Sequence, residues 1–181
     1  MRIGDYFIQW WRMRVSARWI PTGCRILDIG CHQGEFLDFL GDQIAPSVGL
    51  DPLYQANDRK TTHQLLPWSF HEGMPFEEKS FNVITLLATF EHMQNKDTAA
   101  REIKRLLSPG GRVVITVPSV MVDKILDILL ILKFVDGMSL EEHHGFSPED
   151  VPKIFVKEGF KLIKLQRFQL GLNYLYIFER V

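Results

Sequence analysis

The sequence predicts an α/β protein built on a doubly wound, mostly parallel sheet. From residue 25 onward, short apolar runs bounded by turn residues alternate with longer segments of helical period, which is typical of βαβ units. A glycine-containing turn joins the first apolar run to the first helical segment. The 181 residues suit one compact domain, and 46% hydrophobic with 24% charged residues is typical of a globular chain.

The predicted elements follow in chain order from Arg25. Strands are expected at residues 25–29, 47–50, 81–87 and 112–117, and helices at residues 36–40 and 97–107. A further helix begins near Ser147 and ends at Gly159. Two last strands, at residues 161–169 and 173–179, are close enough in sequence to form an antiparallel hairpin around Gly171.

Charge and cysteine usage restrict the function classes. Residues 26–152 carry a net charge of −9, while residues 1–25 and 153–181 each carry +4, so we expect no nucleic-acid partner in the middle of the chain. Cys24 and Cys31 have no His or Cys at zinc-ligand spacing, which favours a reducing, cytoplasmic location and no structural metal. We expect neither a secretion signal nor a membrane span.

The turn after the first strand carries the main functional signal. Its glycines permit a tight turn and the close approach of a ligand. His32 replaces the second glycine of a dinucleotide fingerprint, and Glu35 stands where a pyrophosphate would sit, so NAD is disfavoured. S-adenosylmethionine has no phosphate, and its two cationic groups suit Asp28. Seventeen residues after Gly34, Asp51 ends the second strand, where a carboxylate can accept both hydroxyls of a ribose.

At these positions the chain resembles the class I S-adenosylmethionine-dependent methyltransferases, in particular the small-molecule and lipid-modifying branch of methyltransferase type 11. Blocks in the family's order cover about residues 24–180: Ile26–Phe36, Gly49–Asp51, Met74–Ile84, Glu91–His92, Leu106–Val113, His144–Pro148 and Glu158–Phe160. The resemblance implies a Rossmann-like, seven-stranded sheet with an antiparallel last strand. It also implies a methyltransferase domain over residues 25–181 that takes S-adenosylmethionine as its cofactor.

The resemblance also assigns cofactor-binding residues. It places the methionine portion at the first turn, the ribose at Asp51, and the adenine beside the residues that follow Asp51. The adenine-binding Asp of the family falls at Phe70, so that contact passes to Glu72, a shifted loop or water, with the backbone N–H of His71 against the ring. The full implied set is Asp28, Gly30, Cys31, Gly34, Asp51, Pro52, Leu53, His71, Glu72 and Leu87. The imidazole of His32 narrows the mouth of the site.

Two histidines are candidates for a general base, which would assist an acceptor that must lose a proton. His92 is the first candidate and His144 the second, because imidazole ordinarily titrates near neutrality. The alternatives are a structural hydrogen bond for His92 and a structural loop role for His143 and His144. A metal site of Glu91, His92 and His144 is disfavoured, because Ala88 stands where metal-binding relatives have a Glu; we therefore expect no metal.

Two apolar segments are candidates for substrate selection. Residues 1–24 are predicted to form a basic, aromatic, amphipathic helix. This helix packs on the sheet, covers the acceptor pocket as a lid, or contacts anionic lipid through residues 1–20. Residues 120–135 include Ile125–Leu132, which is apolar on all sides. Such a segment is core, a homodimer interface, a cover over an apolar acceptor, or a peripheral membrane contact.

We therefore expect methyl transfer to an oxygen, nitrogen or carbon of a small acceptor that is apolar or lipid-like. Alignment of the acceptor with the sulfonium methyl can supply about 7 to 11 kcal/mol of the barrier. A non-catalytic module that binds the cofactor or a protein is the alternative that His32 and Phe70 keep open. An NAD-dependent oxidoreductase is the less favoured one.

Overall fold

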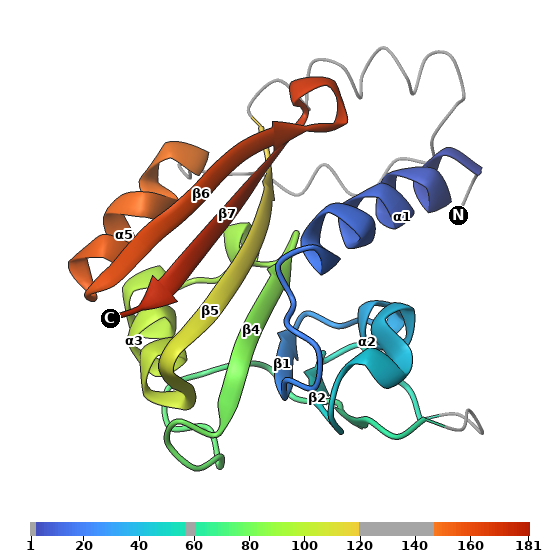
Figure 1. Cartoon of the computed structure of the whole chain (residues 1–181), viewed down its shortest axis with the longest axis horizontal. Coiled ribbons are helices and arrows are strands. Elements are labelled where there is room, and N and C mark those ends of the chain that lie inside the picture. Colours follow the sequence, from blue (N-terminus) through green and yellow to red (C-terminus); the bar gives the residue numbers. More distant parts are fainter. Residues whose placement is uncertain (1–2, 57–60, 120–146) are drawn as a thin grey trace.

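The computed structural model describes residues 3–56, 61–119 and 147–181 (Figure 1). Its centre is a seven-stranded sheet in the order β3-β2-β1-β4-β5-β7-β6. β7 runs antiparallel to both of its neighbours, β5 and β6, and the other adjacent pairs are parallel. The predicted fold is therefore confirmed. The strands are β1 (Ile26–Ile29), β2 (Val48–Leu50), β3 (Gln64–Leu66), β4 (Phe81–Leu87), β5 (Leu107–Pro118), β6 (Phe160–Phe168) and β7 (Asn173–Arg180).

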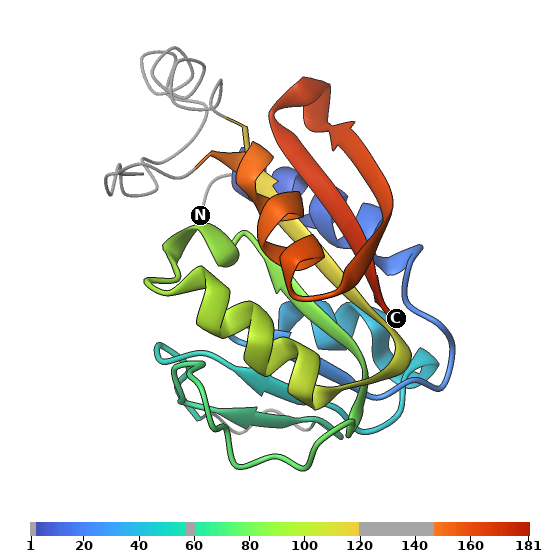
Figure 2. The same ribbon diagram turned by 90° about the vertical axis from the view of Figure 1, so that its left-hand side faces the viewer.

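Helices cover both faces of the sheet (Figure 2). α1 (Ile3–Ala17) and α2 (Glu35–Leu40) pack on one face, whereas α3 (Lys96–Leu106) and α5 (Val151–Lys157) pack on the other. Short 3-10 helices connect the elements at Gly41–Gln43, Phe90–His92, Pro148–Asp150 and Gln169–Gly171. None of the helices in the described ranges has the length and apolar composition needed to cross a bilayer.

β5 shows how the sheet separates two hydrophobic cores. Val113, Ile115 and Val117 face the side covered by α3 and α5, and Val114 belongs to the core under α1 and α2. Because successive side chains of a strand alternate between faces, Thr116 shares the side of Val114. Both faces are buried, which explains why the central strands are apolar along their whole length.

β3 was not predicted from the sequence as a separate element. Gln64 is exposed, Leu65 and Leu66 are half-buried, and the strand lies at the edge of the sheet. Three residues of this composition show neither alternation nor a continuous apolar run. β5 is longer than predicted, because it begins at Leu107 and takes in the Ser108–Gly111 turn through an irregular pairing with β4.

The predicted C-terminal elements are present. Pro148 starts a 3-10 turn and Pro152 lies in the first turn of α5, where a missing N–H breaks no helical hydrogen bond. The hairpin of β6 and β7 turns at Gln169–Gly171, and the Tyr176 hydroxyl donates to the Pro148 carbonyl at 2.8 Å. The predictions for His143, His144 and residues 120–135 lie outside the described residues.

Candidate active site

The turn after β1 is fastened to the end of β2. The backbone N–H groups of Gly30 and Cys31 both donate to the Leu50 carbonyl, at 2.8 and 3.1 Å. Gly30 has a φ of 76°, and a Cβ atom there would lie 2.1 Å from Oγ1 of Thr89, in the loop that follows β4. Glycine is therefore required at this position by the packing of two loops at the carboxyl edge of the sheet.

Asp51 joins the two loops that the sequence assigns to the cofactor. Its Oδ2 accepts from the backbone N–H of His32 at 2.8 Å, and its Oδ1 accepts from the backbone N–H of Leu53 at 2.8 Å. The side chain is nearly buried and is fixed by these two bonds. Each carboxylate oxygen has a further lone pair, so Asp51 can still accept from two hydroxyl groups.

His32 adopts the backbone conformation of the glycine that it replaces. Its φ is 50°, in the left-handed region that costs an L-residue about 1 to 2 kcal/mol. Its exposed ring places Nδ1 2.7 Å from Oε1 of Glu35, and Oε2 of Glu35 accepts from the N–H of Gln33 at 3.1 Å. A carboxylate therefore occupies the turn at the start of α2, where a phosphate would be repelled.

Asp28 is a buried carboxyl beneath this turn. The register of β1 and β4 pairs it with Thr85, whose hydroxyl donates to Oδ1 of Asp28 at 2.5 Å. Burial raises the pKa of Asp28 to about 7; the Thr85 hydrogen bond opposes this rise, and the charges of Glu35 and Asp51 add to it. A bound cation would relieve the repulsion among these acids. The residues present therefore fit a cationic nucleoside without phosphate.

Cys31 lies in the same acidic turn but is chemically quiet. Its side chain is buried, and a Cβ on Gly49 would lie 2.7 Å from its sulfur. Burial, followed by the charges of Asp28 and Asp51, raises the pKa of the thiol. Because the thiolate is the reactive form, this environment disfavours Cys31 as a nucleophile.

The residues predicted beside the adenine differ in their surroundings. Pro52 and Leu53 follow Asp51 directly, and both are apolar and exposed. His71 is also exposed, and its Nδ1 lies 2.8 Å from the Glu72 carbonyl. The Glu72 carboxylate lies 3.5 Å from the guanidinium of Arg101 on α3. Glu72 thus has an ion-pair partner outside the expected adenine site, and its adenine contact stays a prediction.

An ion pair on α3 anchors the loop that carries these residues. Oε1 of the buried Glu102 accepts from the N–H of Met74 at 2.9 Å, and Arg105 binds Glu102 at 2.6 Å. Arg105 also donates to the carbonyls of Met74 and Phe76 at 2.9 and 3.0 Å. This anchor was missed in the sequence, where Glu102 and Arg105 look like an ordinary helical pair on a solvated face.

The loop after β4 brings His92 to the same edge of the sheet as Asp28. His92 ends the 3-10 helix Phe90–His92, its side chain is exposed, and its N–H donates to the Thr89 carbonyl at 3.1 Å. Its role as a base stays a prediction. No cluster of three potential metal ligands is found within residues 3–56, 61–119 and 147–181. Leu87, at the end of β4, is half-buried against the core under α1.

α1 packs on one face of the sheet, and its Arg12 is close enough to the loop after β4 to be affected by the charge of Glu91. Val15 lies in the core shared with α2, and Trp11 packs against that core. Arg12 is deeply placed, so burial lowers the pKa of its guanidinium, while the charge of Glu91 raises it. The N-terminal helix is therefore packed on the sheet, as the simplest sequence interpretation held. Its action as a lid stays a prediction.

Comparisons with known proteins identify the family of this chain. The model of a methyltransferase domain family matches residues 2–165. The demethylmenaquinone methyltransferase of Lactococcus lactis is 29% identical over 87% of this chain and 74% of its own length. The 2-phytyl-1,4-naphtoquinone methyltransferase of Thermosynechococcus vestitus is 30% identical, over 59% of this chain and about half (51%) of its own length.

Solved structures show the same fold. An S-adenosylmethionine-dependent methyltransferase from Mesorhizobium loti superimposes with a TM-score of 0.70, covering 92% of this chain and 96% of its own, at 16% identity. The family model covers most of the chain, including the turn after β1 and the loop after β4. The chain therefore belongs to the methyltransferase domain family and is a class I methyltransferase that uses S-adenosylmethionine.

Proposed function

We propose that the chain methylates a small aromatic quinol that carries a lipid-like tail. The observation that carries the cofactor half of this proposal is Asp51, which is fixed by two backbone N–H groups beside the turn after β1. The acceptor half is supported by relatives that include two demethylmenaquinone methyltransferases and a ubiquinone/menaquinone biosynthesis C-methyltransferase. These relatives are 24% to 29% identical to the chain.

The proposed cofactor site uses the carboxyl edge of β1, β2 and β4. S-adenosylmethionine supplies an electrophilic methyl group on a sulfonium. Asp51 would accept from the ribose hydroxyls, and Leu53 would contact the adenine. Asp28 would balance the positive charge of the cofactor in its ionised form. The hydrogen-bond capacity of Asp51 and the charge of Asp28 support two of these assignments, and the family resemblance supports that of Leu53.

The acceptor must present a nucleophilic carbon in line with the sulfonium methyl. Loss of a proton from a quinol hydroxyl raises the electron density at the adjacent ring carbon. His92, exposed at the end of β4, is the proposed base for that proton. The new bond would form between the ring carbon and the methyl carbon as the carbon–sulfur bond breaks and S-adenosylhomocysteine leaves. Water would then take the proton from the methylated ring carbon, and His92 would return its proton to the ring oxygen, which restores the aromatic quinol.

A transfer assay tests this proposal. The protein is incubated with S-adenosylmethionine labelled in its methyl group and a demethylated naphthoquinol with a short isoprenoid tail, kept reduced. We expect label on a ring carbon. Asp51→Asn should bind the cofactor at least tenfold more weakly and transfer correspondingly less label, and His92→Ala should show a fall of about 100-fold in turnover with intact cofactor binding.

Two results would contradict the proposal. Cofactor binding without transfer to quinols of any tail length would instead favour the non-catalytic binding module. Full turnover of His92→Ala would remove the base while leaving the cofactor site intact. An exposed substitution away from the site, Lys161→Ala on β6, is the matched control and should leave both measurements unchanged.

A further inference from the structure

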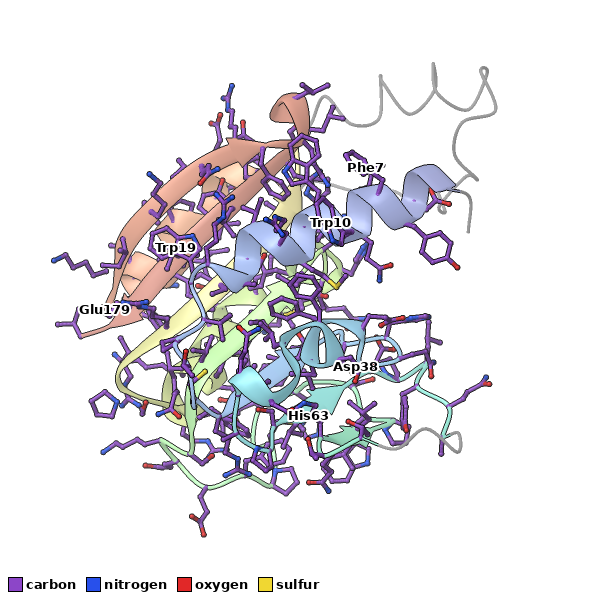
Figure 3. The ribbon with its side chains drawn as sticks, turned by 45° about the vertical axis from the view of Figure 1, so that its right-hand side comes forward. Phe7, Trp10, Trp19, Asp38, His63 and Glu179 are labelled. Carbon is purple, nitrogen blue, oxygen red and sulfur yellow. The ribbon has the colours of Figure 1, made fainter. Side chains whose placement is uncertain are left out.

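α1 carries an exposed aromatic stripe with a cationic end. Phe7 is 55% exposed and Trp10 is 43% exposed, and their rings stack with centroids 6.1 Å apart. The Arg14 guanidinium lies 5.4 Å from the centroid of the Trp10 ring. Figure 3 shows Phe7 and Trp10 along the part of α1 nearer its N-terminus. At spacings of three and four residues, these side chains share one face of the helix.

The tip of the β6–β7 hairpin presents a leucine beside this helix. Leu170 is 94% exposed and has a φ of 56°, and the preceding Gln169 has a φ of 50°. Gln169 is held by two side-chain bonds: its Nε2 donates to the Ile8 carbonyl at 2.6 Å, and its Oε1 accepts from Asn173 at 2.6 Å. The fold therefore holds an apolar side chain in solvent, in a strained turn fastened one residue from Phe7.

These side chains lie at the same end of the molecule as the candidate active site. The hairpin tip adjoins the carboxyl end of β5, because Pro118 pairs with Asn173. Farther along α1, the charge of Glu91, in the loop after β4, acts on Arg12. Phe7, Trp10, Arg14 and Leu170 are called the docking face below.

We propose that the docking face binds the headgroup region of an anionic phospholipid bilayer. Aromatic side chains favour the membrane interface, a leucine favours the acyl boundary, and arginine favours anionic headgroups. The docking face carries the guanidinium of Arg14, and Arg18, four residues farther along the chain, is also exposed; both cations complement such a surface. A two-fold pairing of the same face between two copies would bring these like charges together, which disfavours that occupant. A benefit of membrane binding for methyl transfer rests on the proposed function, because only a lipid-like acceptor would lie in the membrane.

Flotation with vesicles tests the docking face on the full chain without any acceptor. Vesicles of phosphatidylcholine with phosphatidylglycerol are compared with vesicles of phosphatidylcholine alone. Leu170→Asn removes the apolar side chain but keeps a residue that tolerates the left-handed conformation. We expect binding to the anionic vesicles only, and about tenfold weaker binding of Leu170→Asn. Phe7→Ser should weaken binding by a similar factor.

Val156→Ser is the matched control, because Val156 is 53% exposed on α5, across the sheet from α1. It should bind vesicles as the unchanged protein does, and all variants should keep the same affinity for S-adenosylmethionine. Vesicle binding that is absent, or equal in Leu170→Asn and the unchanged protein, overturns the proposal. The proposal is also overturned if light scattering shows that the unchanged protein is a dimer and Leu170→Asn a monomer, since the docking face would then join two copies. Failure of quinol methylation with vesicle binding intact overturns the proposed function alone.

Discussion

Asp28→Asn is predicted to stabilise the cofactor-free protein at alkaline pH while weakening the binding of S-adenosylmethionine. The carboxyl is buried under the turn after β1, and its partner Thr85 can donate equally well to an amide oxygen. The substitution therefore keeps the hydrogen bond and the volume but removes the charge. Stability and ligand binding should change in opposite directions.

The magnitude follows from the raised pKa of Asp28. Burial moves it from an ordinary 3.8 to about 7, so the carboxyl ionises in the unfolded chain before it does in the folded one. The folded state favours the neutral acid, and the stabilisation that results is fully present below about pH 4. It is lost as the pH rises to about 7, which lowers the free energy of unfolding by at most about 4 kcal/mol. Asp28→Asn removes this loss.

Urea denaturation of the cofactor-free protein, followed by circular dichroism, measures the effect. At about pH 8 the free energy of unfolding should be a few kcal/mol higher in Asp28→Asn than in the unchanged protein, and at about pH 4 the two should nearly agree. Asp42→Asn, on an exposed turn, is the control and should show no such pattern. A difference that does not vary with pH would falsify the assignment of a raised pKa to Asp28.

Three further substitutions test other parts of the structure. His32→Gly should raise the free energy of unfolding by about 0.5 to 1 kcal/mol, because relief of left-handed strain exceeds the added entropy of glycine; a fall in melting temperature would contradict this. Glu102→Ala should cost about 3 kcal/mol, since it leaves Arg105 and the Met74 N–H without their acceptor. Burial opposes ionisation of Glu102, but bonds from Arg105, Gly73 and Met74 lower its pKa overall. Its contribution is therefore present above the unfolded pKa and lost on acidification, so the cost in urea denaturation should shrink toward acid pH; a constant cost would argue against the charged pair. Tyr176→Phe should cost about 1 kcal/mol by the same assay through the lost bond to Pro148, with unchanged cofactor affinity.

The central part of the fold could be predicted because its strands are buried on both faces. Continuous apolar runs with glycine turns identified β1, β2, β4 and β5, and the short spacing before β7 identified the hairpin. β3 lacks this signal, because Gln64 is exposed and its two leucines are only half-buried at the edge of the sheet. Edge strands of this length depend on pairing with a neighbour, which a one-dimensional pattern does not contain.

Some residues of the candidate site could likewise be predicted from the sequence, and others could not. Asp28 and Asp51 could be singled out because each lies at the carboxyl end of a strand, two residues from a glycine. Thr85 and Thr89 could not, since their importance depends on the register of β1 with β4 and on the contact of two loops. A threonine within the apolar run Val83–Leu87 was the available signal for Thr85, and it is weak without knowledge of the partner strand.

Calorimetric titration of Asp51→Asn with S-adenosylmethionine tests the cofactor site most directly. The account predicts an affinity at least tenfold below that of the unchanged protein, because a charge-assisted contact to the ribose is lost. Glu72→Gln should bind almost normally, and NAD should produce no heat of binding with any variant. Undiminished affinity of a correctly folded Asp51→Asn protein, or binding of NAD in place of S-adenosylmethionine, would contradict the account.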